Sequence, residues 1–175
     1  MTAQVLPSGR SEPIEIAGGK QGAAPLVLVA IDQRQAGILG EGFAAIDPWA
    51  RYPYPASALT AYFEAAEAGA PRYAILADGD LAGALGLRQN WLRGPYIQFL
   101  GLLPAFQSAG IGGRLLSWCE REAIASGARN LWVAASDFNG DAIRFYERNG
   151  FARVAELEGL IRDDRSEILF RLRLA

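Results

Sequence analysis

The stretch that decides the fold is residues 100–113, which read Leu100-Gly101-Leu102-Leu103-Pro104-Ala105-Phe106-Gln107-Ser108-Ala109-Gly110-Ile111-Gly112-Gly113. Its apolar start predicts the end of a strand, and apolar residues at helical spacing from Ile111 onward predict a helix immediately after the turn. The first N–H groups of a helix have no partners within it and lie at the positive end of its dipole, so they bind phosphate. Glycines at 110, 112 and 113 would let a pyrophosphate approach the main chain without Cβ clashes. The stretch therefore predicts either a phosphate site or a plain, tight connection between a strand and a helix.

Two other nucleotide-binding motifs do not fit this turn. A P-loop needs Gly-Lys-Ser/Thr at the helix start, and Lys20 lies far from it. The dinucleotide fingerprint needs a small residue where Leu115 stands. A looser match at residues 40–45 meets Pro48 within a turn, which leaves no helix to hold a phosphate.

Two motifs instead resemble those of the GNAT family of N-acetyltransferases. Residues 107–112, Gln107-Ser108-Ala109-Gly110-Ile111-Gly112, match that family's acetyl-CoA turn, Gln/Arg-x-x-Gly-x-Gly/Ala. Residues 139–151 match its Asn-x-x-Ala-x-x-x-Tyr-x-x-x-Gly-Phe pattern at every fixed position: Asn139, Ala142, Tyr146, Gly150 and Phe151. The resemblance is specific over residues 96–151, and the order of elements extends it more weakly over residues 26–175.

Apolar runs place further strands and helices on both sides of these motifs. With the resemblance, they predict an α/β (α+β) fold: a mixed, mostly antiparallel sheet of six to seven strands with splayed central strands and about four helices. Residues 25–175 are expected to form a single N-acetyltransferase domain, and residues 1–24 a flexible arm in which residues 13–16 could add an edge strand. The expected strands are 26–31, 73–77, 81–87, 96–103, 131–135, 152–157 and 167–174, with turns at 78–80 and 93–95; the expected helices are 35–46, 57–68 with Ser57 as cap, 112–126 and 139–148.

The resemblance implies where acetyl-CoA would bind. The pantetheine arm would pair with the main chain of residues 100–102, in a gap between that strand and residues 131–135. The Leu102 backbone N–H would polarise the thioester carbonyl, and residues 108–113 would supply donors to the pyrophosphate. Gly101 would permit a bulge there or would be an ordinary strand glycine. The full cofactor-binding set that we expect is Leu100, Gly101, Leu102, Gln107, Ser108, Ala109, Gly110, Ile111, Gly112, Gly113, Asn139 and Tyr146.

Tyr146 occupies the family's general-acid position, where it would protonate the departing CoA thiolate. A phenol suits this role because its basicity is broadly similar to that of the thiolate. The alternative is that Tyr146 is an aromatic residue that packs against the sheet. Asn139 is expected to cap its helix and to contact the cofactor arm.

The family builds its acceptor site from the first two helices and their loop. Here that loop holds Trp49, Tyr52 and Tyr54, which would stack on an apolar or cationic substrate or would cover the edge of the core. The general base is open, because the positions where relatives carry a glutamate read Tyr96 and Ala134. A water relay, Glu41 or Asp47 could substitute, and the pairs Glu156/Glu158 and Asp163/Asp164 would be solvated or would bind the amine.

Composition excludes several classes of function. The chain has no histidine and a single cysteine, Cys119, which rules out a Ser-His-Asp triad, a Cys-His pair and a His- or Cys-rich zinc site, so we expect no metal. A net charge of −2 argues against binding to nucleic acid. The longest apolar run, residues 26–31, is too short to span a membrane, and without a signal-peptide pattern the expected location is cytoplasmic. Cys119 is expected to pack in the core.

These observations predict transfer of an acetyl group from acetyl-CoA to a primary amine by direct attack in a ternary complex. The acceptor would be a small-molecule amine or an amine of a peptide or protein, and the final hairpin would offer a surface for a homodimer. The family favours acetyl over a longer acyl donor. The alternative from a different class is a non-catalytic acyl-CoA-binding sensor or partner module.

Overall fold

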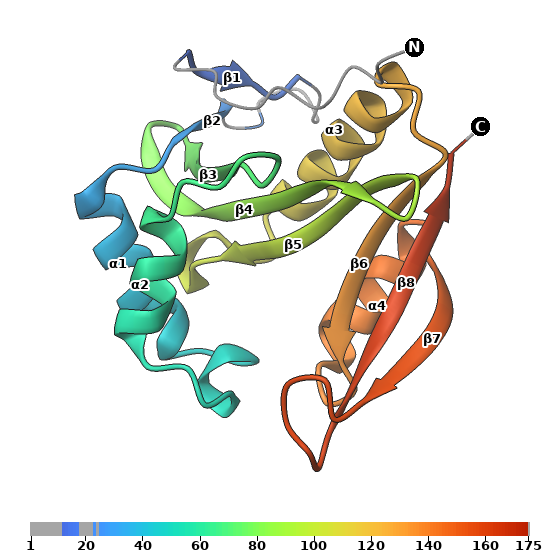
Figure 1. Cartoon of the computed structure of the whole chain (residues 1–175). Coiled ribbons are helices and arrows are strands. Elements are labelled where there is room, and N and C mark those ends of the chain that lie inside the picture. Colours follow the sequence, from blue (N-terminus) through green and yellow to red (C-terminus); the bar gives the residue numbers. More distant parts are fainter. Residues whose placement is uncertain (1–11, 18–22, 24, 175) are drawn as a thin grey trace.

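An eight-stranded sheet with the strand order β1-β2-β3-β4-β5-β6-β8-β7 organises the part of the chain that the computed structural model describes, residues 12–17, 23 and 25–174 (Figure 1). The α+β class, the four helices and the mixed, mostly antiparallel sheet are as predicted. The strands are β1 (Ile14–Glu15), β2 (Leu26–Ala30), β3 (Arg72–Ala77), β4 (Asp80–Trp91), β5 (Gly94–Leu102), β6 (Asn130–Ser136), β7 (Ala152–Glu158) and β8 (Ser166–Arg173). The helices are α1 (Gln33–Ala44), α2 (Ala56–Glu64), α3 (Ile111–Ala125) and α4 (Gly140–Arg148), with 3-10 turns η1 (Trp49–Arg51) and η2 (Pro104–Phe106).

The predicted total of six to seven strands was too low. The eighth strand is β1, a two-residue segment that pairs with β2 and is anchored by the Ile16 N–H, which donates to the Leu26 carbonyl at 2.8 Å. It lies within residues 13–16, where the sequence analysis allowed for a further edge strand. Most of the flexible arm expected at residues 1–24 lies outside the described residues.

The sheet opens in its middle, as predicted. Every neighbouring pair of strands is antiparallel except β5 and β6, which run parallel and pair only through Tyr96 with Trp132 and Ile97 with Val133. Beyond these residues the two strands diverge, and Figure 1 shows the wedge between them.

Helices pack on both faces of the sheet. Successive residues of a strand point to opposite faces, and Ala84 and Leu85 of β4 accordingly belong to different core clusters. One cluster joins α1 and α2 to the sheet around Phe43, Phe63 and Phe99. The other joins α3 and α4 to the opposite face, and Cys119 lies fully buried in it. The wedge is therefore bordered by a different helix pair on each face.

Several element ends differ from the prediction. Helix α1 begins at Gln33 because Asp32 and Gln35 form a capping box, and α2 follows Pro55 without a side-chain cap, so Ser57 is not the cap. The turn at Asp78 and Gly79 is confirmed, but the β4–β5 turn is Leu92-Arg93, two residues with positive φ (41° and 63°), rather than residues 93–95. The turn was placed at 93–95 because glycine and proline are common in turns. Gly94 instead lies where strand β5 packs closely on Asn130, since a Cβ at Gly94 would clash with the Asn130 carbonyl oxygen.

Candidate active site

The main chain of β5 presents polar groups to the wedge. The Leu103 N–H donates to the Ala82 carbonyl on the β4 side at 2.8 Å. Alternation along an antiparallel ladder then turns the N–H and C=O groups of Leu102 and Leu100 away from β4, toward the wedge. The Leu102 carbonyl accepts a hydrogen bond from Gln107 Nε2 at 3.0 Å, which leaves the Leu102 N–H directed at the opening.

Gly101 is explained by packing rather than by a bulge. It pairs in register with Ala84, and the two shifts in register lie elsewhere, between Gly86 and Leu87 and between Arg88 and Trp91. A Cβ at Gly101 would lie 2.6 Å from Phe43 Cε1 and 2.7 Å from Trp49 Cη2. The glycine therefore allows aromatic rings from the acceptor side to lie directly on β5.

The glycine-rich turn forms an open helix start. Helix α3 follows Gly110, which has a left-handed backbone (φ 76°), and no described side chain caps the helix. A Cβ at Gly110 or Gly113 would meet nothing within 4 Å, whereas one at Gly112 would lie 3.0 Å from Phe145 Cζ. Exposed N–H groups at the positive end of a 15-residue helix, with free space before them, form a suitable cradle for phosphate.

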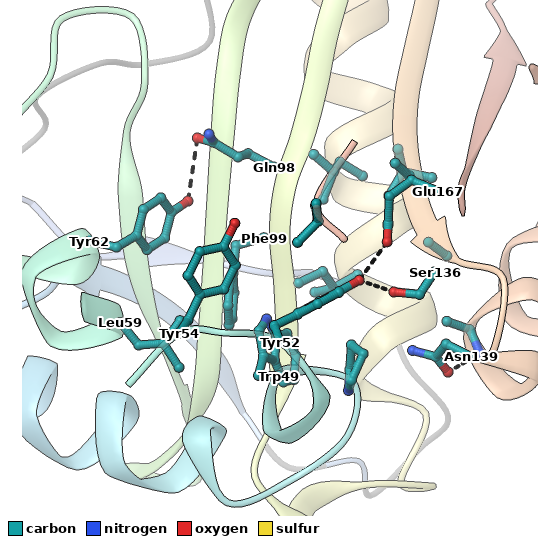
Figure 2. A pocket seen from close by; sticks show the side chains of 18 of the residues that line it. Trp49, Tyr52, Tyr54, Leu59, Tyr62, Gln98, Phe99, Ser136, Asn139 and Glu167 are labelled. Carbon is teal, nitrogen blue, oxygen red and sulfur yellow. Dashed lines mark hydrogen bonds between the residues drawn. The ribbon is translucent and has the colours of Figure 1, made fainter. Parts of the chain in front are cut away.

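A cavity of about 500 Å³ occupies the mouth of the wedge. Figure 2 shows it between the loop after η1, the strand β5 and the start of β8. The cavity brings together six of the residues singled out from the sequence: Trp49, Tyr52, Tyr54, Leu100, Asn139 and Tyr146. The glycine-rich turn, Gly101 and Leu102 are not among its lining residues.

Helix α4 places Tyr146 in the wall of this cavity. Asn139 caps the helix through its side-chain oxygen, which accepts from the Ala142 N–H at 3.1 Å. The Tyr146 ring packs against Phe151 and Phe170, and the side chain is only 6% exposed. Burial raises the pKa of Tyr146, so the phenol stays protonated at physiological pH. Tyr146 can therefore pack against the sheet and also donate a proton as a general acid.

The acceptor-side aromatics have unequal roles. Trp49 stacks on Phe99, with ring centroids 4.7 Å apart and an interplanar angle of 20°, so it both covers the core and lines the cavity. Tyr54 is 43% exposed. The Tyr52 hydroxyl donates to Glu167 Oε1 at 2.7 Å and also contacts the Ser136 hydroxyl (Figure 2).

Glu167 is a candidate functional residue that the sequence analysis missed. It pairs with Ser136 across β6 and β8, lines the cavity, and is 6% exposed. Burial raises the pKa of its carboxyl, and the hydrogen bonds from Tyr52 and Ser136 partly offset this effect. The one available signal was an acidic residue directly before the apolar run Ile168-Leu169-Phe170, where a buried charge is uncommon.

The carboxylates considered from sequence do not reach the cavity. Glu41 is exposed on α1, and Asp47 pairs with Arg51 at 2.7 Å. Acidic residues of the last hairpin are likewise exposed, namely Glu156, Glu158, Asp163 and Asp164. Tyr96 and Ala134 do line the cavity, but burial raises the pKa of Tyr96 to about 12, so it is no base at neutral pH.

Comparison with known proteins places this geometry in a family. The model of the acetyltransferase (GNAT) family matches residues 39–151, which is more than half of the chain. The chain belongs to the GNAT acetyltransferase family. A streptothricin acetyltransferase of Streptomyces lavendulae is 35% identical over 45% of this chain and 42% of its own length. An aminoalkylphosphonate N-acetyltransferase of Salmonella typhimurium is 34% identical over 43% of this chain and 53% of its own. The matches therefore span about half the length of these curated relatives.

Solved structures share the GNAT fold. A GNAT-family protein of Desulfovibrio desulfuricans superposes with a TM-score of 0.70, covering 87% of this chain and 100% of its own at 21% identity. A GNAT acetyltransferase of Elizabethkingia anophelis, solved with acetyl-CoA bound, gives a TM-score of 0.55 over 61% of this chain and 77% of its own at 17% identity.

Other features of this GNAT chain bear on its site. No helix within the described ranges is long and apolar enough to cross a membrane. The same residues hold no group of three or more His, Cys, Asp or Glu side chains arranged for a metal ion. Burial raises the pKa of Cys119 to about 12, which leaves this thiol an unreactive part of the core.

Proposed function

We propose that the protein is an N-acetyltransferase that transfers the acetyl group of acetyl-CoA to a primary amine. The observation that carries this proposal is the wedge between β5 and β6, which has an open helix start at one end and a cavity holding Tyr146 and Glu167 at the other. Membership of the GNAT family and the acetyl-CoA bound to a structural relative support the choice of donor.

The described residues fit an extended acyl-CoA. Residues 108–113 would hold the pyrophosphate, and Leu100 and Leu102 would pair with the pantetheine arm. The Leu102 N–H would donate to the thioester oxygen, where negative charge develops during attack. One such donor is worth roughly 2.7–4 kcal/mol in acyl transfer.

Tyr146 would complete the reaction as the general acid. The amine nitrogen forms a bond to the acetyl carbon and loses a proton, the carbon–sulfur bond breaks, and the departing thiolate takes the phenolic proton, which the proton from the amine then replaces. Since the cavity that holds Tyr146 has a volume of about 500 Å³, it favours a small-molecule acceptor over a folded protein surface.

Release of free CoA in the presence of amines tests this function, with Tyr146→Phe as the diagnostic variant. The phenylalanine ring keeps the packing on Phe151 and Phe170, so we expect unchanged acetyl-CoA affinity and a loss of turnover of roughly 100-fold or more. Acetyl-CoA binding without CoA release for any primary amine would instead support the alternative of a non-catalytic sensor. Full activity of the variant would remove Tyr146 from the mechanism.

A further inference from the structure

We propose that the acceptor is a primary amine carrying one ammonium on an apolar, aromatic-sized body with no anionic group, and that Glu167 receives this ammonium. The inference rests on the proposed acetyltransferase function and specifies the acceptor half of the same site.

The charged residues in and near the cavity favour a cationic acceptor. Among the described residues that line the cavity, Glu167 is the one acidic residue, and no lysine or arginine joins it. The arginines next to lining residues in the sequence, Arg51 and Arg162, form ion pairs with Asp47 and Asp164 at 2.7 Å and 2.9 Å. A phosphonate or carboxylate on the acceptor would therefore be buried beside a carboxylate without a cation, which is costly. A single ammonium is the complementary ligand.

Hydrogen bonds hold the Glu167 carboxylate in a defined direction. Tyr52, from the loop after η1, contacts both Glu167 and Ser136 (Figure 2), and Ser136 at the end of β6 also interacts with the Glu167 carboxyl. The Tyr52 hydroxyl donates to Oε1, so this contact fixes the direction of the carboxylate. No described arginine or lysine forms an ion pair with it. A buried carboxylate that is oriented but lacks a counter-charge is prepared for a cationic ligand.

The walls of the cavity favour an acceptor with an apolar body. Aromatic and aliphatic side chains line the cavity together with Glu167: Trp49, Tyr54, Leu59, Tyr62, Phe99 and Ile161. Tyr62 packs against Phe63 and Phe99 and reaches Gln98 Oε1 at 3.5 Å, and burial raises the pKa of its phenol, which keeps it uncharged. The Arg72 guanidinium lies 4.4 Å from the centre of the Tyr62 ring and is paired with Glu67. Such walls stabilise an apolar ring or chain by burial and stacking, and they give a polyhydroxylated or polycationic body few partners.

In the proposed reaction, Glu167 accepts the first proton from the acceptor. The ammonium gives one proton to the carboxylate and becomes a nucleophilic amine. Its nitrogen attacks the thioester carbon, loses a second proton as the amide forms, and the carbon–sulfur bond breaks. One of the two protons ends on the CoA sulfur and the other is released to solvent, so no further reactant is needed. Glu167 thereby supplies the base that Tyr96 and Ala134 cannot.

Calorimetric titration of amines into the protein saturated with CoA tests the inference. The probes are phenethylamine and 2-aminoethylphosphonate, which share an aminoethyl group and differ in the aromatic ring and the anion. We expect phenethylamine to bind about tenfold or more tightly than 2-aminoethylphosphonate, and Glu167→Gln to weaken phenethylamine by about tenfold or more. The matched control is Glu158→Gln, which changes an exposed carboxylate on the neighbouring strand and should leave the affinity unchanged.

Each outcome separates this inference from the function on which it rests. Equal or tighter binding of 2-aminoethylphosphonate, or no binding of phenethylamine, overturns the acceptor class while acetyl-CoA binding and acetylation of other amines would keep the proposed function. An unchanged affinity in Glu167→Gln overturns the role of the carboxylate. If acetyl-CoA itself does not bind, the proposed function fails and this inference falls with it.

Discussion

Glu167 titrates in a setting that couples its pKa to activity. Four groups face it: Tyr52 from the loop after η1, Ser136 at the end of β6, Asp137 directly after that strand, and Tyr96 on β5. Burial and the charge of Asp137 raise the carboxyl pKa, whereas the hydrogen bonds from Tyr52 and Ser136 lower it. A base must be ionised to act, so the rate should rise with pH through this pKa.

Replacement of Tyr52 by phenylalanine should move that rise. The variant removes the bond that lowers the Glu167 pKa, so we expect the acidic limb of kcat/KM to shift to higher pH and the rate at pH 6 to fall more than the rate at pH 9. Glu158→Gln serves as the control and should leave the limb in place. An unshifted limb in Tyr52→Phe would show that Tyr52 only packs.

The same carboxylate should cost stability at high pH. A carboxyl whose pKa is raised in the folded state contributes stability below its unfolded pKa, and this contribution is lost as pH rises through the folded pKa. Glutamine carries no charge at any pH, so Glu167→Gln should match the wild type in Tm near pH 4 and exceed it at pH 8. In a chain of this size each kcal/mol corresponds to roughly 2–4 °C. A lower Tm than wild type at pH 8 would contradict the buried, unpaired carboxylate described above.

Sequence patterns predicted only part of the candidate site. Asn139 and Tyr146 were found because fixed spacing on one helix is visible in sequence. Glu167 was not found because its partners lie far away in the sequence. Tyr52, which donates a hydrogen bond to it, is 115 positions away, and Ser136, which pairs with it across two strands, is 31 positions away. Only the folded sheet brings these three together, so no local pattern can reveal them.

At the scale of elements, the start of α3 is the feature with the clearest test. Gly113 lies in the first turn, where a Cβ meets nothing within 4 Å. Gly113→Glu should preserve or slightly raise Tm, since an acidic side chain favours a helix N-terminus, and should abolish the stabilisation by acetyl-CoA because its charge competes with the pyrophosphate.

Gly113→Ala is the matched control for this helix start. It adds a methyl group into open space without charge, so acetyl-CoA should still stabilise it. Thermal unfolding with and without the ligand measures both variants. Retained stabilisation in Gly113→Glu would mean that the phosphate does not bind at this turn.

Element types followed from periodicity, and element ends followed from contacts that periodicity does not contain. Apolar spacing identified α3 and α4 within a residue of their observed limits. The β4–β5 turn was misplaced because Leu92 and Arg93, which adopt positive φ, are not turn formers by composition. Gly94 packs closely against Asn130, a contact that forms only in the assembled sheet.

For the molecule as a whole, the two halves of the site come from different parts of the chain. The segment from α1 to α2 packs on one face of the sheet and would form the proposed acceptor wall, whereas the segment from α3 to α4 packs on the opposite face and would form the proposed cofactor cradle (Figure 1). The wedge between β5 and β6 joins them, because only two residue pairs connect these strands. This division is predicted by the sequence motifs and stays a prediction, while the candidate base Glu167 was visible only in the structure.

The most direct test of acetyl-CoA binding is a thermal unfolding titration of the purified protein with acetyl-CoA, CoA and NAD. A ligand specific for the folded state stabilises it by roughly 2.7 kcal/mol at 100 times its dissociation constant. We expect a clear rise in Tm with acetyl-CoA and with CoA and no change with NAD. Failure of both CoA species to raise Tm would contradict the account and leave the glycine-rich turn as a structural connection alone.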